Sequence, residues 1–215
     1  MMALTRLSRL AAPAGFAAAA LALAALVLFT VVAGSGTISQ AARRAVFYAP
    51  TLCALGSIVA LLVALIALFV RQSGEFGPFG LAAFLTALVG TVLGAGGYWT
   101  YVFVLPELSK QAPSVADQSS GSVLAGFFLS FLIMGLGWLL FAVASMRTGV
   151  FPAWAVGLLM IGSLVTIVPL PSRTLVLSLA VACLGYLACR PVPNRHSAPE
   201  PTGWLGHRLK GGRPV

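Results

Sequence analysis

The stretch GLAAFLTALVGTVLGAGGYWTY, residues 80–101, decides the fold because small residues recur along it at helical spacing. Successive small residues are 3, 4, 3, 4 and 3 positions apart, which places them on one face of a helix. They are Gly80, Ala83, Ala87, Gly90, Gly94 and Gly97. In lipid, helices associate through close backbone contact, which small residues permit. We therefore predict that this helix packs tightly at the centre of a membrane helix bundle.

The composition of the whole chain also indicates a membrane protein. Of its 215 residues, 60% are hydrophobic and 8% are charged, and the mean hydropathy is +1.01. A soluble domain carries roughly 25% charged residues. The basic residues, which give a net charge of +9, stand in short gaps between apolar runs and in the C-terminal tail. That distribution is typical of a topology signal facing lipid headgroups, and it predicts no nucleic-acid partner.

Six apolar runs approach or exceed the roughly 20 residues that a membrane span needs. They cover about 14–34, 47–70, 79–105, 121–145, 152–169 and 173–189. We predict an all-α, polytopic helix bundle over residues 1–189. The first run follows Arg6 and Arg9, as a signal peptide would. Its apolar stretch is longer than the 7–15 residues of a cleaved signal, so we predict an uncleaved first span, with five spans if it is cleaved.

The distribution of Lys and Arg between the loops predicts the orientation. With the N-terminus inside, nine basic residues face the cytoplasm and four face outward. The outward set is Arg43, Arg44, Lys110 and Arg173. We therefore expect an inner (plasma) membrane protein with both termini in the cytoplasm. Residues 190–215 carry five basic residues and one Glu, and should form a disordered tail that attaches to anionic inner-leaflet lipid.

The outer end of the third span carries the candidate site. Tyr98 and Tyr101 stand near the expected headgroup level, where Tyr and Trp collect, and Tyr101 continues the face of the small residues. Pro106 is expected to end the helix, and Glu107 begins the loop beyond it. In the fourth run, Trp138 belongs to an aromatic stripe that either lines a lipophilic pocket or packs against neighbouring helices. We take Tyr98, Tyr101, Glu107 and Trp138 as candidate ligand-binding residues.

The sequence lacks the residues that ion-coupled transport, metal binding and catalysis usually require. No ionisable residue lies in the core of any span, although ion-coupled transporters usually need one there. Both histidines are in the tail and no catalytic motif is found, so we predict no metal, no cofactor and no enzyme activity. The favoured function is an accessory or scaffold subunit with a membrane protein partner, or a binder of lipophilic molecules. The alternatives are a permease for a neutral lipophilic solute, and an outer-face enzyme using Glu107, Lys110 and Asp117.

Two segments of the C-terminal half carry a resemblance. They are VLPELSKQAP, residues 104–113, and GLGWLLFAVASMRTGVFPAWAVGLLMIGS, residues 135–163. From residue 98 onward the chain resembles a recurrent type of uncharacterised bacterial multi-pass membrane protein. Those proteins similarly follow a Gly- and Trp-rich fourth helix with a short basic turn and a fifth helix that begins at a proline. The resemblance implies a membrane helix bundle, and no known activity comes with it.

The predicted topology can be tested with reporters that are active on only one side of the membrane. One reporter is fused after Ser114 and a second after His196. We expect the first to report the outside and the second the cytoplasm, because an odd number of spans separates them. A tail reporter that is active outside would contradict the topology.

Overall fold

The computed structural model describes residues 7–32, 37–118, 121–168 and 173–189. Within these ranges the regular structure is entirely helical, with no strand. The prediction of an all-α fold is therefore confirmed for this part of the chain. The predicted tail, residues 190–215, lies outside the described residues.

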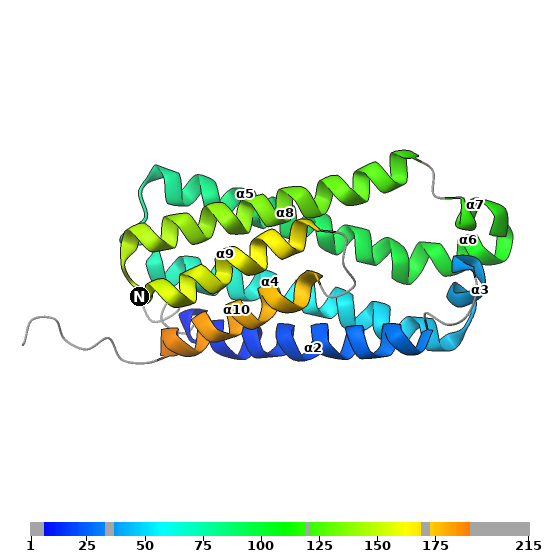
Figure 1. Ribbon diagram of the computed structural model, residues 1–215, viewed down its shortest axis with the longest axis horizontal. Coiled ribbons are helices and arrows are strands. Elements are labelled where there is room, and N and C mark those ends of the chain that lie inside the picture. Colours follow the sequence, from blue (N-terminus) through cyan, green and yellow to red (C-terminus); the bar gives the residue numbers. More distant parts are fainter. Residues whose placement is uncertain (1–6, 33–36, 119–120, 169–172, 190–215) are drawn as a thin grey trace, which may run out of the picture.

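Six helices form the body of the molecule and run side by side (Figure 1). They are α2 (Ala11–Val32), α4 (Tyr48–Gln72), α5 (Pro78–Trp99), α8 (Gly121–Thr148), α9 (Ala153–Ile167) and α10 (Arg173–Cys189). Four helical stretches are long and apolar enough to cross a membrane, namely Ala11–Val31, Ala45–Gln72, Pro78–Gln111 and Gly121–Thr148. With 15 and 17 residues, α9 and α10 are shorter. Four of the six predicted spans thus have a helix of spanning length.

The two ends of the bundle differ. At one end α2 begins and α10 ends, so we call this the terminal end (Figure 1). At the other end lie α3 (Ile38–Ala42), α6 (Leu105–Gln111) and α7 (Pro113–Asp117), which we call the capped end. Two short turns connect the cap to the long helices: η1 (Ala45–Phe47) leads into α4, and η2 (Thr100–Val104) joins α5 to α6.

The long helices contact one another in an order that closes a ring. Around the ring the order is α5, α8, α9, α10, α2, α4 and again α5, and α10 also touches α4. Large apolar side chains fill the space between them. The largest that are fully buried are Trp138, Phe131, Phe141, Ile58, Leu61, Leu65, Leu68, Met134, Leu159, Leu177 and Leu184. The ring is therefore a packed core rather than a passage.

Small residues stand where two helix backbones come closest. A Cβ added at Gly90 would collide with the backbone of Met134 in α8, and one added at Gly137 would collide with the backbone of Ala87 in α5. The same holds between α9 and α10, where a Cβ on Gly162 would lie 2.8 Å from the Cα of Leu177. Of the six small residues that the sequence pattern singles out, Gly80, Ala83, Ala87, Gly90 and Gly94 are buried and Gly97 is half-buried.

The position of α5 in the bundle differs from the sequence-based expectation. In its most apolar stretch 33% of the residues are buried, against 44% for both α4 and α8. Only the face with the small residues is covered, and the other faces expose large side chains. These are Phe79, Leu81, Leu85, Val89, Val92 and Leu93. The prediction that this helix is central is wrong, because a stripe of small residues marks one tight interface and does not bury the rest of the helix.

The prediction that Pro106 ends the third span is also wrong. The helical path continues from Pro78 to Gln111, through the π-helical turn η2 and into α6. In η2 the backbone N–H of Leu105 donates to the carbonyl of Thr100. A proline inside an α-helix lacks a donor and clashes with the carbonyl four residues back. Here it stands at the start of α6, directly after a wider π turn, where it is tolerated.

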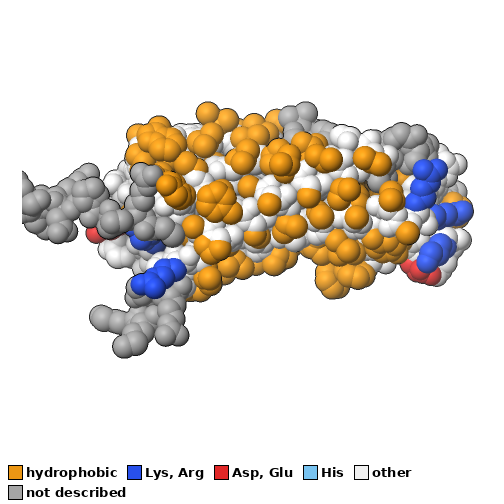
Figure 2. All heavy atoms as spheres, turned by 90° about the horizontal axis from the view of Figure 1, so that it is seen from below, with side chains coloured by type: hydrophobic (Ala, Val, Ile, Leu, Met, Phe, Trp, Pro, Cys, Tyr) orange, Lys and Arg blue, Asp and Glu red, His pale blue; other side chains and the backbone are white. Residues whose placement is uncertain are grey.

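The surface of the bundle is divided into bands. In Figure 2 hydrophobic side chains cover the flank, whereas basic and acidic side chains gather at the two ends. Exposed apolar residues occur on every long helix, for example Val27 on α2, Val59 on α4 and Ile161 on α9. An apolar flank between two charged ends is the surface that a protein presents to a bilayer.

The contact between α5 and α8 can be tested with a pair of matched substitutions. Gly90→Ala places a methyl group against the backbone of Met134, whereas Gly96→Ala meets nothing within 4 Å. We expect Gly90→Ala to lower the free energy of unfolding by about 1–3 kcal/mol through overpacking. Gly96→Ala should be neutral or stabilising by up to roughly 1 kcal/mol, because Ala favours a helix over Gly. Unfolding in dodecyl sulfate, followed by tryptophan fluorescence, measures the stability of both variants. Equal unfolding midpoints for Gly90→Ala and Gly96→Ala would contradict the tight contact.

Candidate functional site

The most unusual group of side chains lies near the capped end and combines one cation with four aromatic rings. We call it the arginine–aromatic cluster. Its members are Tyr98, Tyr101, Phe127, Phe131 and Arg173. The ring centroids of Phe127 and Phe131 are 5.0 Å apart, and that of Tyr98 lies 6.2 and 6.0 Å from them. Three helices, α5 with its π turn, α8 and α10, contribute to the cluster.

The guanidinium of Arg173 covers the two phenylalanine rings. Its Cζ lies 3.5 Å from the centroid of Phe131 and 4.7 Å from that of Phe127. Each such cation–π contact stabilises by about 0.5–2 kcal/mol, more where water is excluded. Arg173 is the first residue of α10, and its carbonyl accepts a 3.2 Å hydrogen bond from the hydroxyl of Thr166 in α9. This contact ties the start of α10 to the end of α9.

No carboxylate of the described residues neutralises Arg173. Among these residues the only ion pair joins Lys110 to Glu107. Asp117 is engaged by Ser39 in the cap, and the side chain of Arg173 makes no hydrogen bond within the described part of the chain. A guanidinium offers five N–H donors. Stacking over rings uses its face and leaves the donors at its edge free for an acceptor.

The length of α5 gives the position of the cluster along the bundle. Near the terminal end, the guanidinium of Arg147 lies 4.7 Å from the ring centroid of Phe79. Trp99 is twenty residues further along α5, and a helix rises about 30 Å over that distance, which matches the hydrocarbon thickness of a bilayer. Trp99 is exposed on the flank. Tyr98, and with it the arginine–aromatic cluster, lies at the same level.

The structure brings together two of the four candidate ligand-binding residues. The rings of Tyr98 and Tyr101 lie 6.4 Å apart within the cluster. Glu107 is exposed on α6 and pairs with Lys110 at 3.1 Å. Trp138 is fully buried, and its Nε1–H donates to the hydroxyl of Thr91 at 3.0 Å. Trp138 is therefore a core residue with its polar group satisfied, two helical turns from Phe131.

Tyr101 connects the cluster to the cap. Its ring centroid lies 5.5 Å from that of Phe127, and it also packs on a small apolar core formed by Ala42 and Phe47, next to Leu105. The side chain is half-buried. Gly97, the last small residue of the α5 face, makes room for the ring of Phe127, which a Cβ there would meet at 3.1 Å.

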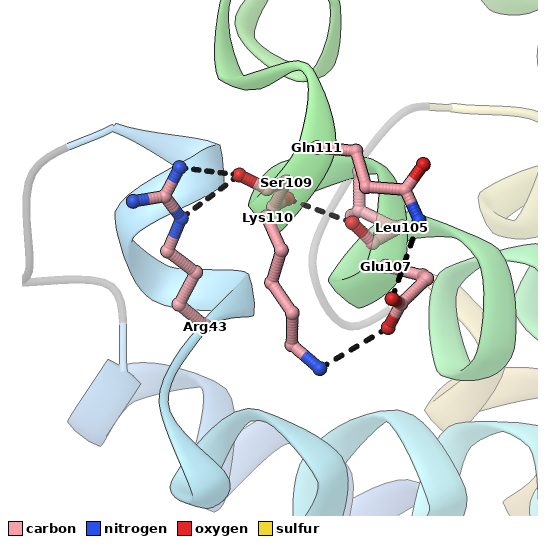
Figure 3. A network of polar contacts seen from close by, with 6 residues as sticks. All are labelled: Arg43, Leu105, Glu107, Ser109, Lys110 and Gln111. Atoms are coloured by element: carbon pink, nitrogen blue, oxygen red, sulfur yellow. Dashed lines mark hydrogen bonds and ion pairs between the residues drawn. The ribbon is translucent and has the colours of Figure 1, made fainter.

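A polar network fastens α3 to α6 (Figure 3). The Nε and Nη2 of Arg43 both donate to the carbonyl of Ser109, with Nε at 2.8 Å. Ser109 belongs to the last turn of α6, whose carbonyls have no partner within the helix. The hydroxyl of Ser109 in turn donates to the carbonyl of Leu105 at 2.7 Å. Arg43 thus caps the C-terminal end of α6 from a neighbouring helix, a favourable place for a cation.

A second contact fastens α3 to α7. The carboxylate of Asp117 accepts hydrogen bonds from the backbone N–H of Ser39 at 2.8 Å and from its hydroxyl at 2.7 Å. The backbone hydrogen bond from Ser39, followed by that from its hydroxyl, lowers the pKa of Asp117 from its ordinary value of 3.8. The carboxylate of Asp117 is thus occupied by a contact within the cap.

The outer polar residues do not form a shared acid–base site among the described residues. Glu107 is held by Lys110 and by Gln111 on its own helix, whereas Asp117 is held by Ser39 on α3. In this part of the chain no three His, Cys, Asp or Glu side chains come together in a way that could hold a metal ion. The arrangement is suited to structural capping, and it supports no proton-transfer step.

Sequence reasoning missed Arg173 as a site residue, because it placed this arginine only among the basic residues that face outward. A signal was present in the pattern, since Phe127 and Phe131 are four residues apart and share a helix face. That spacing brings the two rings together, tilted by 56° to each other, but it does not reveal which cation contacts them. Comparisons with protein-family models, with curated proteins and with solved structures give no match. The function is therefore argued from the chain's own residues.

The contact between Asp117 and Ser39 makes a prediction about pH. A lowered pKa means that the carboxylate stabilises the docking of α3 fully above its ordinary pKa of 3.8. This stabilisation is lost as the pH falls through the lowered pKa. Hydrogen–deuterium exchange of the amides of Ile38–Ala42, corrected for intrinsic rates, should show protection that is constant above about pH 5 and declines toward pH 2.

Two variants test this assignment. Asp117→Asn should weaken the protection of α3 near neutral pH and remove its dependence on acid. Glu75→Gln, which removes a carboxylate from the turn between α4 and α5, serves as the control and should retain the acid dependence. Equal profiles for wild type and Asp117→Asn would contradict the contact.

Proposed function

We propose that the chain is a non-enzymatic integral membrane protein of a bacterial inner membrane. It crosses the bilayer six times, has both termini in the cytoplasm, and binds a lipophilic molecule at its outer, capped end. The single observation that carries the binding function is the arginine–aromatic cluster. An arginine without a carboxylate partner among the described residues, stacked on rings at the headgroup level, is suited to an amphiphilic ligand.

The six crossings are supported by how far α10 reaches along the bundle. Its first residue, Arg173, covers Phe127 and Phe131 on α8. These rings are 21 and 17 residues from Thr148, where α8 ends at the terminal end. A helix rises roughly 25–31 Å over those distances, close to the hydrocarbon thickness of about 30 Å. With 15 and 17 residues, α9 and α10 rise roughly 22 and 25 Å, which is most of one bilayer thickness.

The orientation is supported by the positions of the chain ends and of the basic residues. The start of α2 and the end of α10 lie at the same end of the bundle (Figure 1). Arg43 is one of the four basic residues predicted to face outward. It has a separate structural role there, because it caps α6. The predicted attachment of the tail to anionic inner-leaflet lipid concerns residues outside the described part of the chain.

The alternatives have less support. A permease needs a passage or a second arrangement of its helices, but fully buried side chains such as Trp138, Phe141 and Leu65 fill the ring. An outer-face enzyme needs Glu107, Lys110 and Asp117 to cooperate, yet each is held by its own partner. An accessory subunit would need a membrane protein partner, which the following experiment also detects.

The proposed function predicts that the purified protein retains lipid. The full chain is extracted in a mild detergent, and native mass spectrometry identifies the co-purifying lipids and proteins. We expect adducts of one or a few lipid molecules that survive gel filtration. Added lipid should also raise the midpoint of thermal unfolding of the delipidated protein. Protein without adducts and without any such rise would overturn the lipid-binding function, and a stoichiometric protein partner would favour the accessory function.

A further inference from the structure

We propose that the arginine–aromatic cluster binds the phosphate group of a membrane lipid, with the guanidinium of Arg173 and the hydroxyl of Tyr101 as donors. This inference rests on the proposed function and adds the chemistry of the headgroup. It assigns a separate role to each member of the cluster. Phe127 and Phe131 hold the guanidinium in place, Arg173 supplies the charge, and Tyr101 supplies a second donor from the side of the cap.

The charge and geometry of Arg173 fit a phosphate. A guanidinium presents parallel N–H donors in a planar fork that matches two oxygens of a phosphate, and such bidentate contacts are among the strongest hydrogen bonds in proteins. The two rings restrict the position of the guanidinium, with Phe131 only 3.5 Å from Cζ. This arrangement reduces the rotamer entropy that a free arginine would lose on binding. The ligand therefore meets donors whose orientation is already set.

Tyr101 lies where it can act together with Arg173. Both side chains contact the ring of Phe127, Tyr101 at 5.5 Å between ring centroids and the Cζ of Arg173 at 4.7 Å from the centroid, and the hydroxyl of Tyr101 makes no hydrogen bond to the described residues. The ring is held between Phe127 on one side and the small core of Ala42 and Phe47 on the other. The hydroxyl is not among the buried polar atoms, so it remains accessible from outside the protein and can donate to a phosphate oxygen near Arg173.

The position of the cluster favours a lipid over a free anion. It lies at the level of Trp99, where the headgroups of the outer leaflet begin, so a lipid brings its phosphate to this depth. Two exposed apolar side chains on α9, Ile161 and Leu164, are three residues apart and share one helix face, and the exposed Val168 directly follows the helix. Acyl chains can lie against that face while the phosphate stays at the arginine.

The test uses the full-length, delipidated protein and lipids that share the same tails. Native mass spectrometry measures the binding of dioleoyl phosphatidylglycerol, of dioleoylglycerol, which lacks the phosphate, and of oleate, which carries a carboxylate. Inorganic phosphate is added alone in a fourth series, with thermal unfolding as the measurement. We expect phosphatidylglycerol to bind about tenfold or more tightly than dioleoylglycerol, the size of one hydrogen-bonded charge contact.

Three variants and a matched control locate the effect. Arg173→Gln should lower phosphatidylglycerol binding to the level of dioleoylglycerol, and Arg173→Lys should restore part of it, because the charge returns without the planar fork. Tyr101→Phe, which removes only the hydroxyl, should weaken binding several-fold. Arg44→Gln is the control. Arg44 is exposed in the cap, so this substitution removes the same charge at a site outside the cluster. If Arg173→Gln does not fold, the weaker binding of phosphatidylglycerol expected for Arg173→Lys and for Tyr101→Phe still tests the phosphate site.

The possible outcomes separate this inference from the proposed function. Equal binding of phosphatidylglycerol and dioleoylglycerol, or equal losses in Arg173→Gln and Arg44→Gln, overturns the phosphate site but leaves lipid binding intact. Oleate binding as tight as that of phosphatidylglycerol shows a general anion site and overturns the phosphate assignment. If inorganic phosphate raises the midpoint of thermal unfolding as much as phosphatidylglycerol does, the site binds free phosphate, and the assignment to a lipid is overturned. If no lipid binds at all, both proposals fail.

Discussion

Close contact between the backbones of α5 and α8 is the constraint on which the rest of the structure depends. In lipid the two helices gain little from burying apolar side chains, so they need the dense packing that Gly90 and Gly137 permit. This contact fixes the register of the antiparallel pair. Seven residues along α5 from Gly90 lead to Gly97, and seven residues back along α8 from Met134 lead to Phe127, where the two helices meet again. A shift of this register would disassemble the arginine–aromatic cluster.

The two ends of the bundle meet different physical demands. Around the terminal half, six helices close a ring whose interior is mostly apolar, and the indole of the buried Trp138 donates to the hydroxyl of Thr91. Toward the capped end the chain leaves its helices, so backbone groups lose their intrahelical partners. Arg43 and Asp117 supply those partners from the side, and in doing so they fasten α3 to α6 and α7. Tyr101 spans both regions, because it packs on the cap and on Phe127 alike.

The sequence predicts the features that depend on local spacing. The small residues of 80–97 identified a buried helix face, and the apolar runs located the long helices within a few residues. Features that depend on distant contacts could not be predicted. Ser39 and Asp117 are 78 positions apart, and Arg173 meets Phe131 only because α9 and α10 fold back along α8. The prediction that Pro106 ends the third span failed for a different reason. A π turn lets the helix continue past the proline, and the sequence pattern does not predict that turn.

In the proposed function, Arg173 serves ligand binding as well as folding. The guanidinium of Arg173 is only partly buried, and its nitrogens remain accessible to an acceptor from outside the protein. Arg43 shows the contrasting case, because its donors bind a protein carbonyl and thereby stabilise the cap. Arg173 has no such acceptor among the described residues. A ligand that brings an anionic acceptor to the level of Trp99 supplies the contact that the fold itself leaves unmade.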